Sequence, residues 1–93
     1  FEQADRKVFQ NLDHAFAAMA AGGNKSWVLN AANEVTVQLF LEEQIDFTDI
    51  ARLNGDAMAA VEFIAQPSLE DLYATDQKAR QWVNERAKTI KMN

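Results

Sequence analysis

Apolar residues recur along this chain at helical spacing, and no stretch alternates apolar and polar residues as a half-exposed strand does. The first periodic segment runs from about Lys7 to Ala21. One face of that segment carries Phe9, Leu12, Phe16 and Met19. Gly22-Gly23 then predicts a helix end, because glycine accepts the left-handed conformation there. Residues 1–6 lack this period and predict an extended lead-in, the end of a linker.

A second helix is expected from about Trp27 to Gln44, with Ser26 as its N-cap. Ten of the fifteen residues from Trp27 to Leu41 are apolar. A helix that is apolar nearly all round is normally buried on most sides. This segment is therefore predicted to be the central helix of the core.

A third helix is expected to start with Thr48 as its cap, Phe47 packing back from the position before it, and Asp49 in its first turn. Its apolar face consists of Ile50, Leu53, Ala57, Val61 and Ile64. Asn54-Gly55 is a strong turn signal in the middle of this segment. We therefore expect a kink or a break there.

The last helix is expected after Pro67, with Ser68 and Asp71 forming a capping box. Thr75-Asp76 could cap it again partway. The apolar face of this helix consists of Leu69, Leu72, Val83, Ala87 and Ile90. Four helices joined by short loops predict an all-α fold, an antiparallel four-helix bundle over residues 7–93.

Composition narrows the possible functions. The chain has 93 residues, 48% of them hydrophobic, which predicts a single packed domain rather than a disordered tail. Its formal net charge of −5 argues against nucleic acid and anionic membranes as partners. No apolar run approaches the roughly 20 residues of a membrane span. The absence of cysteine excludes disulfides, thiolate metal sites and cysteine catalysis.

Candidate chemistry is sparse. His14 is the only histidine and lies away from the predicted apolar face, so a solvated side chain is favoured over a ligand or base. An acidic group invites a calcium interpretation, but it lacks the alternating ligands and the glycine of a calcium loop. That group consists of Glu42, Glu43, Asp46 and Asp49. No glycine-rich phosphate loop or hydrolase motif is present.

Two polar constellations fall on helices. Asn30, Asn33 and Glu34 share one edge of the predicted central helix. Asp76 and Arg80 stand one turn apart within the apolar face of the last helix, where we expect a buried ion pair completed by backbone N–H groups. These residues either line a substrate or metal pocket or form internal hydrogen bonds that fix helix register. The second interpretation is favoured, because no matched catalytic group accompanies them.

Several segments together resemble the C-terminal region of 1-deoxy-D-xylulose 5-phosphate reductoisomerases. The resemblance is carried by the segment 28–37 (VLNAANEVTV), Phe40-Leu41, the segment 45–51 (IDFTDIA), the segment 67–71 (PSLED), and Asp76 with Ala79-Arg80. Flanking matches extend it over essentially the whole chain.

The resemblance implies a C-terminal helical domain of a cytoplasmic bacterial enzyme of isoprenoid synthesis. That enzyme would bind NADPH in one domain and Mg²⁺ or Mn²⁺ in a central catalytic domain. These two domains of the same polypeptide are the expected partners of this chain. No catalytic, cofactor or metal residue carries over to the present sequence, so the domain itself is expected to be non-catalytic. An independent helical protein-interaction module and a small metal-binding protein remain the alternatives.

Overall fold

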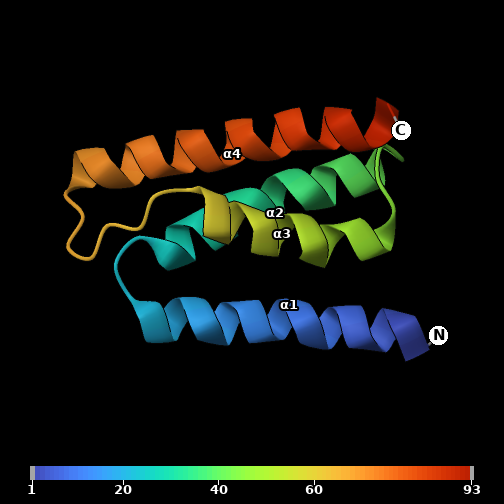
Figure 1. The fold of residues 1–93 in the computed structure, drawn as a ribbon, viewed down its shortest axis with the longest axis horizontal. Coiled ribbons are helices and arrows are strands. Elements are labelled where there is room, and N and C mark those ends of the chain that lie inside the picture. The colour runs from blue at the N-terminus through green and yellow to red at the C-terminus, as the bar shows by residue number, and fades with distance from the viewer. Residues whose placement is uncertain (1, 93) are drawn as a thin grey trace.

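The computed structural model of the chain describes the backbone of residues 2–92 and the side chains of residues 10–90. Its elements are α1 (Glu2–Ala21), α2 (Lys25–Leu41), α3 (Phe47–Ala60) and α4 (Leu69–Met92), with no strand in the described backbone. The predicted all-α class is confirmed. Successive helices run in opposite directions, with α1 and α4 on the outside and α2 and α3 between them (Figure 1).

The two inner helices hold the fold together. α2 and α3 each contact all three other helices, whereas α1 and α4 do not contact each other within the described part of the chain. The prediction that the segment after Trp27 forms a central helix is therefore confirmed. Its buried positions include Val28, Ala31, Ala32 and Thr36.

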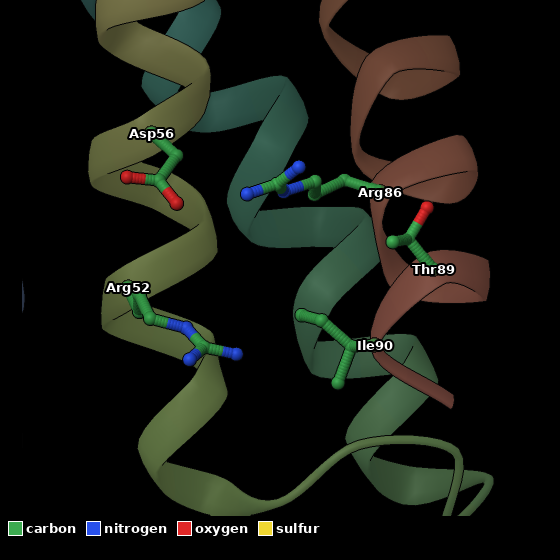
Figure 2. Close-up of a pocket in the computed structure, with 5 residues that line it drawn as sticks. All are labelled: Arg52, Asp56, Arg86, Thr89 and Ile90. Atoms are coloured by element: carbon green, nitrogen blue, oxygen red, sulfur yellow. The ribbon is translucent and has the colours of Figure 1, made fainter. Parts of the chain in front are cut away.

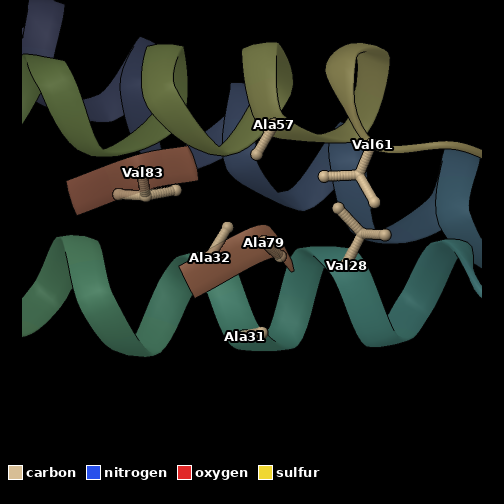
Figure 3. Close-up of a cluster of buried hydrophobic side chains, with 7 residues drawn as sticks. All are labelled: Val28, Ala31, Ala32, Ala57, Val61, Ala79 and Val83. Atoms are coloured by element: carbon tan, nitrogen blue, oxygen red, sulfur yellow. The ribbon is translucent and has the colours of Figure 1, made fainter. Parts of the chain in front are cut away.

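The core consists of two apolar clusters rich in alanine. The larger lies between α2, α3 and α4 and contains Val28, Ala31, Ala32, Ala57, Val61, Ala79 and Val83 (Figure 3). The smaller contains Ile45, Ile50, Leu53 and Ala87. Short side chains let these helices approach closely, at the cost of burying few large apolar groups. No described side chain of α1 belongs to either cluster.

The beginning of α1 differs from the prediction. The helix starts at Glu2, not Lys7, so the extended lead-in is wrong from Glu2 onward. Residues 2–7 are mostly good helix formers without proline or glycine, and their lack of apolar period does not prevent a helix. Phe1 lies outside the described residues. The assignment of residues 1–6 to a linker stays a prediction.

The apolar face predicted for α1 is not its buried face. Leu12, Phe16 and Met19 are 49%, 60% and 73% exposed, and the side chain of Phe9 lies outside the described range. The side turned toward α2 and α3 instead carries Asn11, His14, Ala15 and Ala18, of which Ala18 is fully buried. The helix thus packs through its small and polar side.

The ends of α2 also differ from the prediction. Ser26 is not the N-cap, because it lies exposed within a helix that already begins at Lys25. The helix ends at Leu41 rather than Gln44 because Glu43 adopts the left-handed conformation, with φ of 59°. The Gln44 N–H then donates to the Leu39 carbonyl at 2.8 Å and closes the turn. Ile45 follows as a buried residue.

α3 begins one residue before the predicted cap. Its N-cap is Asp46, not Thr48, and the Asp46 N–H donates to the Asp49 carboxylate at 2.9 Å. The helix is continuous through Asn54 and Gly55, so the expected break is absent and the kink is not confirmed. Both residues make interhelical contacts instead of a turn.

The start of α4 was predicted correctly. The Ser68 N–H donates to the Asp71 carboxylate at 3.0 Å, and the Asp71 N–H donates to Ser68 Oγ at 3.1 Å, which is a reciprocal capping box. The second cap at Thr75-Asp76 is wrong, since the helix continues without interruption. Its buried side consists of Thr75, Ala79, Val83 and Ala87.

Candidate functional site

Four polar side chains meet where α1, α2 and α3 come together, and we call them the asparagine seam: Asn11, Asn33, Thr36 and Asn54. Asn54 Nδ2 donates to Asn33 Oδ1 at 2.9 Å and to Asn11 Oδ1 at 3.0 Å. Thr36 Oγ1 lies 3.0 Å from Asn54 Oδ1. The Asn54 side chain, which is fully buried, therefore has partners for both its amide hydrogens and its oxygen.

The asparagine seam ties three helices in one register. A buried amide without partners costs about 1–3 kcal/mol, so a shift of any one helix would leave unpaired groups behind. No described buried side-chain nitrogen or oxygen lacks a partner. The hydrogen bonds of the seam therefore join the helices of this chain to one another. Every polar side-chain atom of Asn54 already has a partner within the chain.

His14 lies beside the seam and corrects the prediction of a solvated histidine. Its ring is partly buried between α1 and α3, and Nε2 lies 3.1 Å from the Ala51 carbonyl oxygen. Because a carbonyl only accepts, Nε2 must carry the hydrogen. The same ring covers Gly55, where a Cβ would lie 2.8 Å from Nε2. Gly55 thus allows α3 to approach α1 closely.

Asn24 ties the start of α2 to the loop before α4. It is fully buried, and its Nδ2 donates to the Glu62 carbonyl at 2.9 Å and to Thr75 Oγ1 at 3.0 Å. Its Oδ1 accepts from the Ile64 N–H at 2.8 Å, and its own N–H donates to the Ile64 carbonyl at 3.0 Å. The residue has the N-cap position of α2 but uses its side chain for tertiary contacts.

A charged triad joins α2 to α4. Arg80 Nη2 donates to Glu34 Oε1 at 2.7 Å, and Arg80 Nε donates to Asp76 Oδ2 at 2.9 Å. The hydrogen bond to Asp76, and then that to Glu34, holds the pKa of Arg80 above its ordinary value. The guanidinium therefore remains charged at every working pH.

The structure separates the residues that the sequence placed together. Asn33 lies in the asparagine seam, Glu34 pairs with α4, and Asn30 is exposed with no hydrogen bond to the described residues. The pairing of Asp76 with Arg80 is present, but the Asp76 side chain is 24% exposed and the predicted backbone donors do not bond it within the described part. The buried side of α4 lies one residue away, at Thr75.

Several of these polar residues were not identified from the sequence. Asn24 and Asn54 stand beside glycines, where asparagine normally indicates a turn or a cap. Asn11 stands between Gln10 and Leu12 and carries no such signal. Thr36 stands within a long apolar segment that is predicted to be buried. A buried hydroxyl needs a polar partner, and this was the one signal in the sequence for such a contact. Helical spacing identifies a face of one helix but not the residue that will oppose it on another.

A glycine turn followed by a helix start is a geometry that can hold a phosphate, but the groups at the start of α2 do not fit one. Gly22 and Gly23 have φ of 71° and 55°, which makes a tight turn before a helix start. The turn is filled, however, because the Ile64 carbonyl accepts the Asn24 N–H there and a Cβ at Gly23 would collide with it. The Lys25 ammonium donates to the Met58 carbonyl. A nucleotide phosphate would find these donors engaged.

The described residues contain no group of three or more histidine, aspartate, cysteine or glutamate side chains that could hold a metal ion. In the acidic group at the end of α2, Glu42 accepts from Gln38 Nε2 at 2.8 Å, and Asp49 pairs with Arg52 at 2.9 Å. Each of these two carboxylates has a partner within four residues along the chain.

An open hollow between α3 and α4 brings two cations near one acid. It is lined by Arg52, Asp56, Arg86, Thr89 and Ile90, and the Arg86 side chain extends from α4 toward α3 (Figure 2). Arg52 already pairs with Asp49. The hollow holds no nucleophile with an adjacent base, which is what acyl or proton transfer requires.

None of the helices in the described backbone has both the length and the apolar character needed to span a bilayer. The fold and its contacts define a small all-α domain whose helices are held in register by buried amides and one charged triad. The chain belongs to the DXP reductoisomerase C-terminal domain family, whose family model matches residues 1–82.

Curated relatives agree with this assignment. The chain is 48% identical over 85 residues to a protein of an Exiguobacterium species named 1-deoxy-D-xylulose 5-phosphate reductoisomerase. Proteins of the same name from Bacteroides fragilis and Ralstonia pickettii are 41% and 44% identical over 85 and 81 residues. These alignments cover 91%, 91% and 87% of this chain but 22%, 22% and 20% of the relatives. The chain thus spans about a fifth of their length. No solved structure matches it.

Proposed function

We propose that this chain is the C-terminal helical domain of a 1-deoxy-D-xylulose 5-phosphate reductoisomerase, and that it supports the enzyme without performing chemistry. The family assignment carries the proposal. The interhelical bonds support it, because Asn33 bonds Asn54 on α3 and Glu34 pairs with Arg80 on α4, so these side chains are engaged in joining helices. Asp76 pairs with Arg80 within α4.

The whole polypeptide would rearrange and reduce 1-deoxy-D-xylulose 5-phosphate to 2-C-methyl-D-erythritol 4-phosphate in the bacterial cytoplasm. NADPH would supply the hydride and Mg²⁺ or Mn²⁺ would polarise the substrate oxygens, both held by residues outside this chain. The expected partners of the domain are the catalytic and NADPH-binding domains of the same polypeptide. The net charge of −5 supports the view that nucleic acid and anionic membranes are not among them.

A second function, an independent helical module that binds another protein, is favoured by one observation. Large apolar side chains such as Phe16, Leu41 and Tyr73 are at least 60% exposed, and exposed apolar surface often marks an interaction site. In this alternative the chain would bind a separate protein and would not need a reductoisomerase.

A grafting experiment distinguishes the two proposed functions. This chain replaces the C-terminal fifth of the Exiguobacterium relative, and NADPH oxidation with the deoxyxylulose substrate is compared in the graft, the intact relative and the truncated relative. We expect the truncated protein to lose activity and the graft to regain at least a tenth of the intact rate. The chain alone should show no turnover and no micromolar binding of NADPH or Mn²⁺ by calorimetry. A graft as inactive as the truncated protein, or ligand binding by the chain alone, would contradict the proposal.

A further inference from the structure

The outward side of α1 presents three large apolar side chains, Leu12, Phe16 and Met19, which we call the α1 face. They are 49%, 60% and 73% exposed and follow one another at helical spacing. A surface helix normally turns such a stripe toward its own core. Here a neighbouring side of the helix, which includes Asn11, His14 and Ala18, packs on α2 and α3. The α1 face is therefore available to something outside the described structure.

The α1 face continues onto the neighbouring helices. Leu12 lines a groove together with Val37 of α2 and Phe47 of α3, which are themselves 37% and 38% exposed. Met19 lines a second groove along α2 with Leu29. No charged residue occurs from His14 to Asn24, so the part of α1 that carries Phe16 and Met19 is apolar throughout.

The area of the α1 face indicates what kind of partner covers it. Taking roughly 200 Å² for a fully exposed large side chain, the three residues expose on the order of 350 Å². Two separate proteins usually need about 800 Å² each to associate stably. A partner tethered in the same polypeptide does not lose the translational freedom that free association costs, so a smaller contact suffices. Mutual repulsion of two chains of net charge −5 also opposes a second copy.

The relatives provide such a tethered partner. They are about five times as long as the matched segment, and the matching family model describes a C-terminal domain, so most of their remaining length precedes α1. We infer that the α1 face is the docking surface for the preceding part of the same polypeptide. This inference rests on the function proposed above and specifies its contact surface. α1 then packs through two neighbouring sides, with its small and polar side on α2 and α3 and its large apolar side on the rest of the enzyme.

Photo-crosslinking in the longer polypeptide tests this assignment. Phe16 is replaced by p-benzoylphenylalanine, which preserves an aromatic side chain, and Tyr73 on α4 is replaced in the same way as a control, since it is 64% exposed. We expect residue 16 to form crosslinks with the preceding part of its own chain at a yield at least fivefold above that from residue 73. Equal yields from the two positions would overturn the inference. Crosslinks joining two copies at residue 16 would overturn it in favour of self-association.

A thermal test needs no unnatural residue. Phe16→Glu with Met19→Glu should lower the melting temperature of the longer polypeptide by several degrees yet leave that of the 93-residue chain within one or two degrees. The control pair, Leu69→Glu with Tyr73→Glu on α4, should change neither. An equal loss in both proteins would mean that the α1 face stabilises the bundle itself, which contradicts the inference. NADPH oxidation by the unsubstituted polypeptide reports separately on the proposed function.

Discussion

The imidazole of His14 on α1 lies directly against Gly55 on α3, and a Cβ at Gly55 would lie 2.8 Å from His14 Nε2. Glycine within an exposed helix normally costs about 1 kcal/mol relative to alanine. At this position the missing side chain instead lets two helices meet and keeps His14 within reach of the Ala51 carbonyl.

Gly55→Ala should therefore destabilise the chain by about 1 kcal/mol, because the ring must move and give up its hydrogen bond. In a His14→Ala background the same substitution should stabilise by about 1 kcal/mol, since only helix propensity remains. Urea unfolding of the two single variants and the double variant measures this change of sign. Stabilisation by Gly55→Ala in the unsubstituted chain would show that the ring does not limit the approach.

Asn33 and Asn30 form a matched pair on α2. Asn33→Ala should lower the free energy of unfolding by about 1–3 kcal/mol, because it leaves the buried amide of Asn54 with one partner fewer. Asn30→Ala should change it by less than about 0.5 kcal/mol, as for an ordinary surface residue. Denaturant unfolding of both variants decides the matter. Equal losses would mean that the seam contributes nothing beyond helix propensity.

Asn24→Asp tests the link between α2 and the loop before α4. The change keeps the shape but removes both hydrogens that reach the Glu62 carbonyl and Thr75, and it brings a charge into a buried place. We expect a loss of about 2–4 kcal/mol. Asn30→Asp, which adds the same charge at an exposed site, serves as the control. A loss equal to that of the control would contradict the role assigned to Asn24.

The charged triad of Glu34, Asp76 and Arg80 should contribute modestly to the free energy of unfolding. Asp76→Asn is expected to cost about 0.5–1 kcal/mol rather than the ~3–5 kcal/mol of a buried pair, since the triad is partly exposed. Glu85→Gln on the same helix removes an equal charge without breaking an ion pair among the described side chains. The difference between these variants should shrink in 1 M salt, which screens exposed charges.

The pH dependence of the triad has a definite sign. A raised pKa at Arg80 means that its contribution is complete below the unfolded pKa and is lost only when the pH rises through the still higher folded value. That value lies above the range in which the protein would be handled. The stability difference between the unsubstituted chain and Asp76→Asn should therefore be constant from pH 7 to pH 10. A decline over this interval, measured by urea unfolding, would count against a stably charged Arg80.

Glu43, which follows the C-terminal end of α2, occupies a backbone conformation where glycine is the usual residue. Its φ of 59° is normally adopted by glycine, and a side chain there costs about 1–2 kcal/mol. Glu43→Gly should stabilise the chain by about 1 kcal/mol. Glu42→Gly, one residue earlier at φ of −87°, should not stabilise it. Thermal unfolding of the two variants distinguishes them, and equal effects would contradict the explanation.

The sequence was sufficient to predict those features that depend on the residues of one helix alone. The number of helices, the face of α3 that includes Leu53 and the capping box at Ser68 follow from spacing and residue type alone. The orientation of α1 did not follow, because the large stripe containing Phe16 was assumed to face the bundle. Spacing shows that a helix has an apolar side, but not whether that side meets this domain or another part of a longer chain.

The same limit explains the site. Asn54-Gly55 has the residue types of a turn. Within α3, Asn54 bonds Asn11 of α1, and Gly55 leaves room for the ring of His14. Asp76 lies close to the centre of the apolar residues of α4, yet α2 and α3 cover the side at Thr75 and Ala79 instead. Which side of a helix is covered depends on its partners, and residue spacing within that helix does not reveal them.

The position of α1 outside both apolar clusters sets this helix apart from the other three. α2, α3 and α4 share the clusters, whereas α1 is held by the asparagine seam, His14 and small side chains. Local opening of α1 would break these contacts and uncover the Asn54 amide, but it would remove no described side chain from either apolar cluster. Movements of a longer polypeptide joined before α1 would therefore reach the other three helices through the amide and small-residue contacts of α1.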